Sequence, residues 1–178
     1  SASAANTALP GPFESLGAII AKFGAVGLSE HDVASLSGGH SIGRARCALL
    51  APRLYNFNGT GLPDPTLSAS YLEVLRAFCG PPATASSSTV LANLDVSTPD
   101  VFDNKYYQNL KVSSGLLGSD QVLLSTPGAG TVGLVNAFAG NQRAFFAAFA
   151  RSMIKMGDIS PLLAPNGQIR KNCHFVNA

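Results

Sequence analysis

The sequence predicts a mainly α-helical chain with at most short β pairings, on the basis of three observations. Apolar residues recur at helical spacing in several segments, and helix-capping residues precede several of these segments. The alternation of apolar and polar residues that would indicate strands is slight. No internal repeat and no linker-like stretch divides the 178 residues, so we expect a single domain with a hydrophobic core.

The first predicted helices lie in the N-terminal quarter. Pro12 suits a helix start, and the residues around and after it keep helical spacing: Phe13, Leu16, Ile20 and Phe23. Ser29 followed by Asp32 forms a capping-box pattern, which predicts a short helix that ends before Gly38.

The later elements are expected to be helical as well. Asp64 and Pro65 provide a cap and a start for a helix whose apolar face runs to Phe78. The remaining predicted helices cover residues 102–110, 131–139 and 141–156. Residues 116–117 and 168–169 are the candidates for short β pairings.

Composition and charge exclude two classes of partner. The net charge is +2 and no basic run is longer than Arg170–Lys171, so the chain lacks the basic patch typical of nucleic-acid binding. The longest apolar stretch, residues 144–150, is closed by Arg143 and Arg151, and a membrane helix needs about 20 such residues. Only 12% of the residues are charged, about half the usual share.

The three cysteines leave two readings open. In a secreted protein, the odd number of Cys47, Cys79 and Cys173 implies a partner elsewhere or a free thiol. In a cytosolic protein, all three would be reduced and buried. Asn58 begins an Asn-Gly-Thr glycosylation sequon in a loop rich in Gly and Pro, which favours the secreted alternative.

His40 is the most informative single residue. It follows two glycines and precedes a hydroxyl residue in the segment LSGGHSIGRARC, residues 36–47. Without further context, a hydrogen-bonded structural histidine is the simpler interpretation, and His31 and His174 are expected to be solvated. No His/Cys cluster has zinc spacing, but a haem needs only one protein ligand on its proximal side.

The segment around His40 resembles the proximal-histidine segment of the class III secretory plant haem peroxidases. Other blocks resemble the same family in the same order, so the resemblance covers nearly the whole chain: residues 4–13, 32–43, 56–66, 94–107, 115–121 and 156–173. It implies a haem-peroxidase fold, with residues 1–178 forming its proximal, C-terminal part. The implied activity is oxidation of phenolic-type donors by hydrogen peroxide.

The resemblance also implies roles for individual residues at the haem. His40 would be the axial ligand of the iron of haem b, and Asp120 would accept a hydrogen bond from its other ring nitrogen. Such a bond makes the imidazole more anionic and lowers the reduction potential of the iron. Pro10 would lie at the edge of the channel for small aromatic donors. Arg46 and Leu49 would follow the ligand along the haem edge.

A calcium site is implied next to the haem ligand. Its oxygen donors would be the side chains of Ser41, Asp95, Thr98 and Asp103 and the main-chain oxygen of Val101. Hard oxygen ligands of this kind suit Ca²⁺. Two departures from the family are visible: Ser41 stands where Thr is commoner, and Leu94 stands where the family carries an aromatic residue beside the imidazole.

The cysteines and the location of the protein follow from the same resemblance. It implies a disulfide between Cys47 and Cys79, whereas the partner of Cys173 would belong to an upstream part. Asn58 would be glycosylated, in a protein of the cell wall, apoplast or vacuole. The expected partners are hydrogen peroxide, small aromatic donors and a missing N-terminal half, with no nucleic acid and no membrane.

The distal His and Arg of the family have no counterpart in this sequence. Because positioned acid–base catalysis contributes about 10²–10⁴-fold, the isolated chain is expected to be inactive or very weak. Two alternatives remain. One is a non-catalytic, secreted domain derived from the peroxidase fold and stabilised by calcium. The other is an intracellular peroxidase of the ascorbate type, against which Cys47, Cys79 and the sequon at Asn58 argue.

Overall fold

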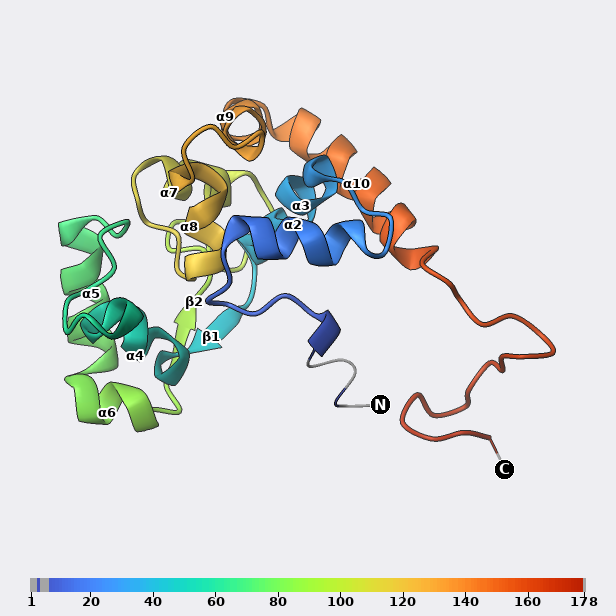
Figure 1. Ribbon diagram of the computed structural model, residues 1–178, viewed down its shortest axis with the longest axis horizontal. Coiled ribbons are helices and arrows are strands. Elements are labelled where there is room, and N and C mark those ends of the chain that lie inside the picture. Colours follow the sequence, from blue (N-terminus) through green and yellow to red (C-terminus); the bar gives the residue numbers. More distant parts are fainter. Residues whose placement is uncertain (1–2, 4–6, 178) are drawn as a thin grey trace.

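The computed structural model describes residue 3 and residues 7–177, and these form a mainly helical fold with one small sheet (Figure 1). The elements are α2 (Leu16–Gly24), α3 (Glu30–Ser37), the 3-10 turn η1 (Gly38–Ser41), β1 (Arg44–Arg46), α4 (Cys47–Tyr55), the 3-10 turn η2 (Phe57–Gly59), α5 (Ala69–Cys79), α6 (Pro82–Ser87), β2 (Leu91–Asn93), α7 (Lys105–Lys111), α8 (Gly118–Ser125), α9 (Thr131–Gly140) and α10 (Gln142–Gly157). The predicted mainly α class is therefore confirmed.

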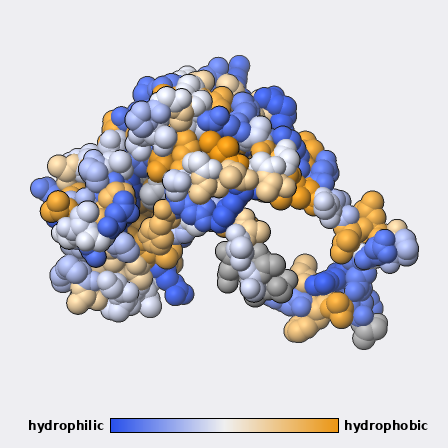
Figure 2. All heavy atoms as spheres, in the orientation of Figure 1, coloured by the Kyte–Doolittle hydropathy of each residue, from blue (hydrophilic) through white to orange (hydrophobic). Residues whose placement is uncertain are grey.

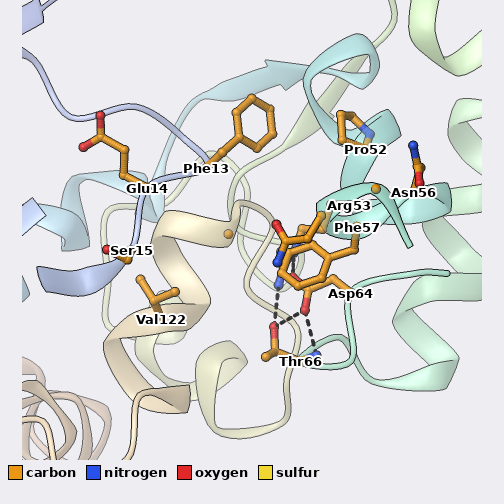
Figure 3. Close-up of a pocket in the computed structure, with 13 residues that line it drawn as sticks. Phe13, Glu14, Ser15, Pro52, Arg53, Asn56, Phe57, Asp64, Thr66 and Val122 are labelled. Carbon is orange, nitrogen blue, oxygen red and sulfur yellow. Dashed lines mark hydrogen bonds and ion pairs between the residues drawn. The ribbon is translucent and has the colours of Figure 1, made fainter. Parts of the chain in front are cut away.

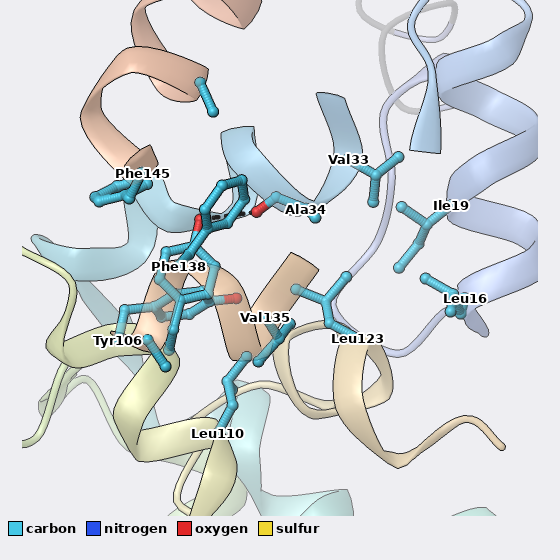
Figure 4. Packing of buried hydrophobic residues seen from close by; sticks show 13 residues of the cluster. Leu16, Ile19, Val33, Ala34, Tyr106, Leu110, Leu123, Val135, Phe138 and Phe145 are labelled. Carbon is cyan, nitrogen blue, oxygen red and sulfur yellow. Dashed lines mark hydrogen bonds between the residues drawn. The ribbon is translucent and has the colours of Figure 1, made fainter. Parts of the chain in front are cut away.

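The larger of two hydrophobic clusters lies among α2, α3, α7, α8, α9 and α10 (Figure 4). Its fully buried side chains include Tyr106, Tyr107, Leu110 and Phe145. The second cluster joins α4, α5, α6 and the sheet, which gather at the lower left of Figure 1. The disulfide between Cys47 and Cys79 lies inside this second cluster and ties α4 to the end of α5.

Local capping explains where several helices begin. The Ser29 hydroxyl accepts a hydrogen bond from the amide of Asp32 at 3.3 Å, and the Asp32 carboxylate accepts the amide of Ser29 at 2.7 Å. The Asn141 side chain accepts the amide of Ala144 at 3.0 Å and opens α10. The predicted capping box and the break between α9 and α10 are both present.

Three local expectations were wrong. The first helix begins at Leu16 and not at Pro12, because the side chain of Ser15 caps it by accepting the amide of Ala18. The helix expected from Asp64 begins only at Ala69, because the Asp64 carboxylate binds the side chains of Arg53 and Thr66 instead of capping a helix. The short β pairing involves neither of the expected segments. It joins β1 and β2 in antiparallel register, with Ala45 opposite Ala92.

Residues 116–117 and 168–169 have other environments. The amide of Leu117 donates to the Asp120 carboxylate rather than to a neighbouring strand. Ile169 lies in the tail that follows α10 and is 96% exposed, so no apolar contact holds it against a partner strand.

Apolar side chains reach the surface on α10 and in the tail beyond it, where they are visible as orange spheres in Figure 2. The most exposed ones are Ile169, Leu162, Leu163, Phe175 and Ile154. Among the described residues, none of the helices combines the length and the hydrophobicity required to cross a bilayer.

Candidate functional site

His40 lies in the η1 turn, directly after α3. Helices α7 and α10 pack against the start of this turn. Gly38 makes this approach possible, because a Cβ there would collide with the rings of Tyr107 and Phe145. The Tyr107 hydroxyl donates to the carbonyl of Ala34 at 2.8 Å, which fixes the last turn of α3 against α7. The chain just before His40 is thus packed closely against α7 and α10 at Gly38.

One ring nitrogen of His40 is bound to a buried carboxylate. Nδ1 lies 2.7 Å from Oδ1 of Asp120, a residue that is only 1% exposed and sits in the first turn of α8. The other carboxylate oxygen of Asp120 accepts the amide of Leu117 at 2.9 Å. Because the carboxylate accepts a hydrogen bond from Nδ1–H, the neutral imidazole has its free lone pair at Nε2.

The environment of His40 pulls its pKa in two directions. Burial lowers the pKa, whereas the hydrogen bond that His40 donates to Asp120 and the negative charge of Asp120 raise it, and the net pKa lies above the usual 6.5. Its side chain remains 39% exposed, so the free edge of the imidazole is accessible from outside. A ligand can therefore reach Nε2 while Asp120 holds Nδ1.

His40 opens onto a cavity of about 550 Å³ with a mainly apolar lining. Pro10 and Leu49 belong to this lining, whereas Arg46 does not. Other apolar lining residues come from α2, α3 and α10, and include Phe23, Leu36, Phe149, Met153 and Met156. A single nitrogen ligand at the wall of an apolar cavity fits a flat, hydrophobic metal macrocycle such as haem.

The five residues expected at the cation site lie close together around Ser41, on the side of η1 next to His40. The Ser41 hydroxyl is 3.2 Å from the carbonyl oxygen of Val101 and 2.9 Å from that of Asp103. The Thr98 hydroxyl lies 3.0 Å from Oδ2 of Asp103. Ser41 and Asp95 are fully buried.

Asp95 is the residue of this group whose hydrogen bonding is incomplete. Its Oδ1 accepts hydrogen bonds from the amides of Ser97 and Thr98 and from the side chain of Asn109, at 2.7, 3.0 and 2.8 Å. Its Oδ2 is buried and has no hydrogen-bond partner among the described residues. A buried carboxylate oxygen without a partner is costly, and a hard cation would satisfy it.

The donor set is rich in oxygen but contains only two carboxylates. Accordingly, no cluster of three or more His, Cys, Asp or Glu side chains occurs in the part of the chain that the structure describes. Hydroxyl and carbonyl oxygens together with Asp95 and Asp103 suit Ca²⁺ and are poor ligands for zinc or copper.

The remaining predicted site residues lie away from this region. Cys47 and Cys79 form a disulfide, and Cys173 is an exposed free thiol in the tail. Asn58 lies in η2 with a positive φ of 52°, on an exposed loop that a glycan can reach. Leu94 is half-buried and packs against the second cluster, so the aromatic ring nearest His40 is that of Tyr106.

Sequence reasoning missed a buried ion pair beside a second cavity of about 560 Å³ (Figure 3). Arg53 donates to the Asp64 carboxylate at 2.7 Å, and both side chains are almost fully buried. A second guanidinium nitrogen of Arg53 donates to the carbonyl of Leu116 at 2.6 Å. Arg53 thereby connects α4 to the segment that leads into α8 and Asp120, which gives it a structural role.

Comparison with known proteins agrees with this geometry. The family model described as "Peroxidase" matches residues 1–141. Over 98% of its length the chain is 54% identical to Peroxidase 54 of Arabidopsis thaliana, 47% identical to the lignin-forming anionic peroxidase of Nicotiana tabacum and 48% identical to Peroxidase C1B of Armoracia rusticana. The matched regions make up 48%, 53% and 49% of these relatives, so the chain spans about half their length, on the C-terminal side.

Proposed function

Because the chain belongs to the peroxidase family, as a relative of its plant class III members, we propose that it supplies the proximal half of a haem peroxidase. The observation that carries this proposal is the accessible His40, held at Nδ1 by the buried carboxylate of Asp120 at the wall of an apolar cavity. The proposed activity of the whole protein is oxidation of small phenolic-type donors by hydrogen peroxide.

In this proposal His40 binds the iron of haem b through Nε2, and the apolar cavity covers one face of the macrocycle. Haem supplies the redox chemistry by which peroxide is reduced and a donor is oxidised. Asp120 keeps the Nδ1 proton in a strong hydrogen bond, which fixes the tautomer and makes His40 a more basic ligand. The apolar residues of α10 exclude water from the ligand side of the site.

We further propose that Ser41, Asp95, Thr98, Val101 and Asp103 bind Ca²⁺. The unpartnered Oδ2 of Asp95 and the convergence of five oxygen-bearing residues support this assignment. Ser41 directly follows His40, so a cation held at Ser41 would restrain the backbone of the iron ligand. Bound calcium would thereby stabilise the backbone conformation of His40.

The setting of the protein is inferred from the same relationship. The tobacco relative is named a lignin-forming peroxidase, which favours aromatic donors that enter past Pro10, a residue that lines the cavity of His40. The disulfide and the exposed sequon at Asn58 support a secreted glycoprotein of the cell wall, apoplast or vacuole. A distal half that carries the peroxide-cleaving acid and base would complete the site, and without it this chain is inactive or very weak.

The test of the iron ligand is haem titration of the 178-residue chain and of three alanine variants. His40→Ala should abolish the absorbance band of histidine-ligated haem, and imidazole added to the solution should restore it by occupying the emptied position. His31→Ala and His174→Ala are the matched controls and should bind haem as the parent does. Equal haem binding by all three variants would contradict the assignment.

A second function is favoured by the buried Asp95 oxygen, which does not depend on the cavity at His40. On this alternative the chain is a secreted, non-catalytic domain that calcium stabilises. The two functions differ in one measurement: the alternative requires calcium-dependent stability without any histidine-ligated haem band in the parent chain.

A further inference from the structure

One oxygen atom of the Asp120 carboxylate accepts hydrogen bonds from two side chains. Oδ1 accepts the Nδ1 hydrogen of His40 at 2.7 Å and the hydroxyl hydrogen of Tyr106 at 3.1 Å. Among the residues that the structure describes, Oδ2 accepts only the amide of Leu117, at 2.9 Å. Tyr106 therefore competes with His40 for the negative charge on one atom.

Tyr106 is rigidly placed for this contact. It lies in α7, is 1% exposed and belongs to the buried cluster drawn in Figure 4. Its ring meets that of His40 edge to face, with centroids 6.3 Å apart and an interplanar angle of 83°. The side chain of Asn104 anchors the start of α7 by donating to the carbonyls of Phe138 and Ala139 at 2.9 and 3.0 Å.

The hydroxyl of Tyr106 acts as a donor in this arrangement. Burial raises the pKa of Tyr106 well above its ordinary value of 10, and the negative charge of Asp120 raises it further. The phenol is therefore neutral and keeps its proton at neutral pH. A neutral phenol next to a carboxylate donates its hydrogen to it.

We propose that Tyr106 is a positioning residue that weakens the hydrogen bond between Asp120 and His40 by drawing charge from Oδ1. A carboxylate oxygen that already accepts one hydrogen bond is a weaker acceptor for the next, because the first donor stabilises part of its charge. The imidazole is then less anionic, and a bound haem iron has a higher reduction potential than Asp120 alone would set. This consequence for the iron rests on the proposed function, whereas the competition at Oδ1 does not.

The test replaces Tyr106 by Phe and uses Tyr107→Phe as the matched control. Tyr107 is the next residue of α7, is equally buried, and donates to the carbonyl of Ala34 rather than to Asp120. Tyr106→Phe should shift the NMR resonance of the His40 Nδ1 proton downfield in the cofactor-free chain, because the bond to Oδ1 strengthens. Tyr107→Phe should leave this resonance in place.

The second measurement is the reduction potential of the haem-loaded chain. Tyr106→Phe should move it to a more negative value, and Tyr107→Phe should not. A resonance that stays or moves upfield in Tyr106→Phe, or an equal shift in both variants, overturns the proposal. If the chain binds no haem, the proposed function fails while the NMR measurement still decides the competition at Oδ1.

A third variant covers the case in which Tyr106→Phe does not fold. 3-Fluorotyrosine introduced at position 106 keeps the ring and its hydroxyl but makes the phenol a stronger donor. The stronger donor should draw more charge from Oδ1 and shift the Nδ1 proton of His40 upfield, opposite to the effect of Phe. A downfield shift, or none, would refute the proposed competition.

Discussion

Replacing Asp95 by Asn tests the calcium site at its most informative atom. Oδ1 of Asp95 accepts three hydrogen bonds, while the buried Oδ2 accepts none among the described residues. Asn keeps an oxygen for the three donors and places an NH₂ group where Oδ2 was. The substitution therefore removes a cation ligand and leaves the local hydrogen bonds in place.

The expected magnitudes differ sharply between calcium-free and calcium-loaded protein. An unsatisfied buried polar atom costs about 1–3 kcal/mol, but Oδ2 of Asp95 and the NH₂ group that replaces it are both such atoms, so this cost largely cancels between parent and variant. Without calcium, Asp95→Asn should change the free energy of unfolding by less than about 1 kcal/mol. At a free calcium concentration 100 times the dissociation constant, the parent should gain about 2.7 kcal/mol, and the variant should gain almost nothing.

Urea unfolding, followed by circular dichroism in chelator and in calcium, measures both quantities. Asp100→Asn is the matched control, because Asp100 lies in the same loop but its side chain is 76% exposed and pairs with Arg44. It should keep the full calcium response. The calcium site would be refuted if calcium did not change the unfolding free energy of the parent. It would also be refuted if calcium stabilised the Asp95→Asn variant as strongly as the parent.

Two further predictions concern stability. Burial would raise the pKa of Asp32, but hydrogen bonds from Lys155 and Ser152, among others, lower it well below 3.8. The stabilisation is therefore full above pH 3.8 and is lost as the pH falls through the lower folded-state pKa. Asp32→Asn should lower the free energy of unfolding by about 2–3 kcal/mol at pH 7, and this free energy should depend less on pH below pH 4 than in the parent. Urea titrations at pH 7 and at several pH values below 4 measure both effects. Replacing Cys47 and Cys79 by Ser should cost about 3–4 kcal/mol in the same assay, and the loss should match that of reduced parent protein.

The helices were largely predictable because their signals are local. Ser29 and Asp32 form their capping box within one turn, and Asn141 caps α10 through a residue three positions away. The start of α5 was not predictable in the same way. Asp is a residue type that often caps helices, but the Asp64 carboxylate is bound by Arg53 of another helix. Because of this contact, Asp64 does not cap α5.

The site was predictable only in part, for a similar reason. The resemblance named His40 and Asp120, but the residues that adjust them are distant in sequence and ordinary in type. Tyr106 lies 14 positions before Asp120 and looks like any apolar helix residue until its hydroxyl is placed 3.1 Å from the carboxylate. The short sheet escaped prediction because its two strands have three residues each, too few to show a period of two.

Helix α7 connects the two parts of the site through three successive contacts. At its start, the amide of Lys105 donates to Asp103 at 2.8 Å, and one turn later Asn109 donates to Asp95 at 2.8 Å. Tyr106, which lies between them in the sequence, donates to Asp120 at 3.1 Å. A movement of the oxygen atoms around the proposed cation would therefore be transmitted to α7, the helix whose Tyr106 contacts the Asp120 carboxylate. Ser41 is joined to His40 through the backbone, and α7 is joined to it through the side chains of Tyr106 and Asp120, so both connections end at the same imidazole.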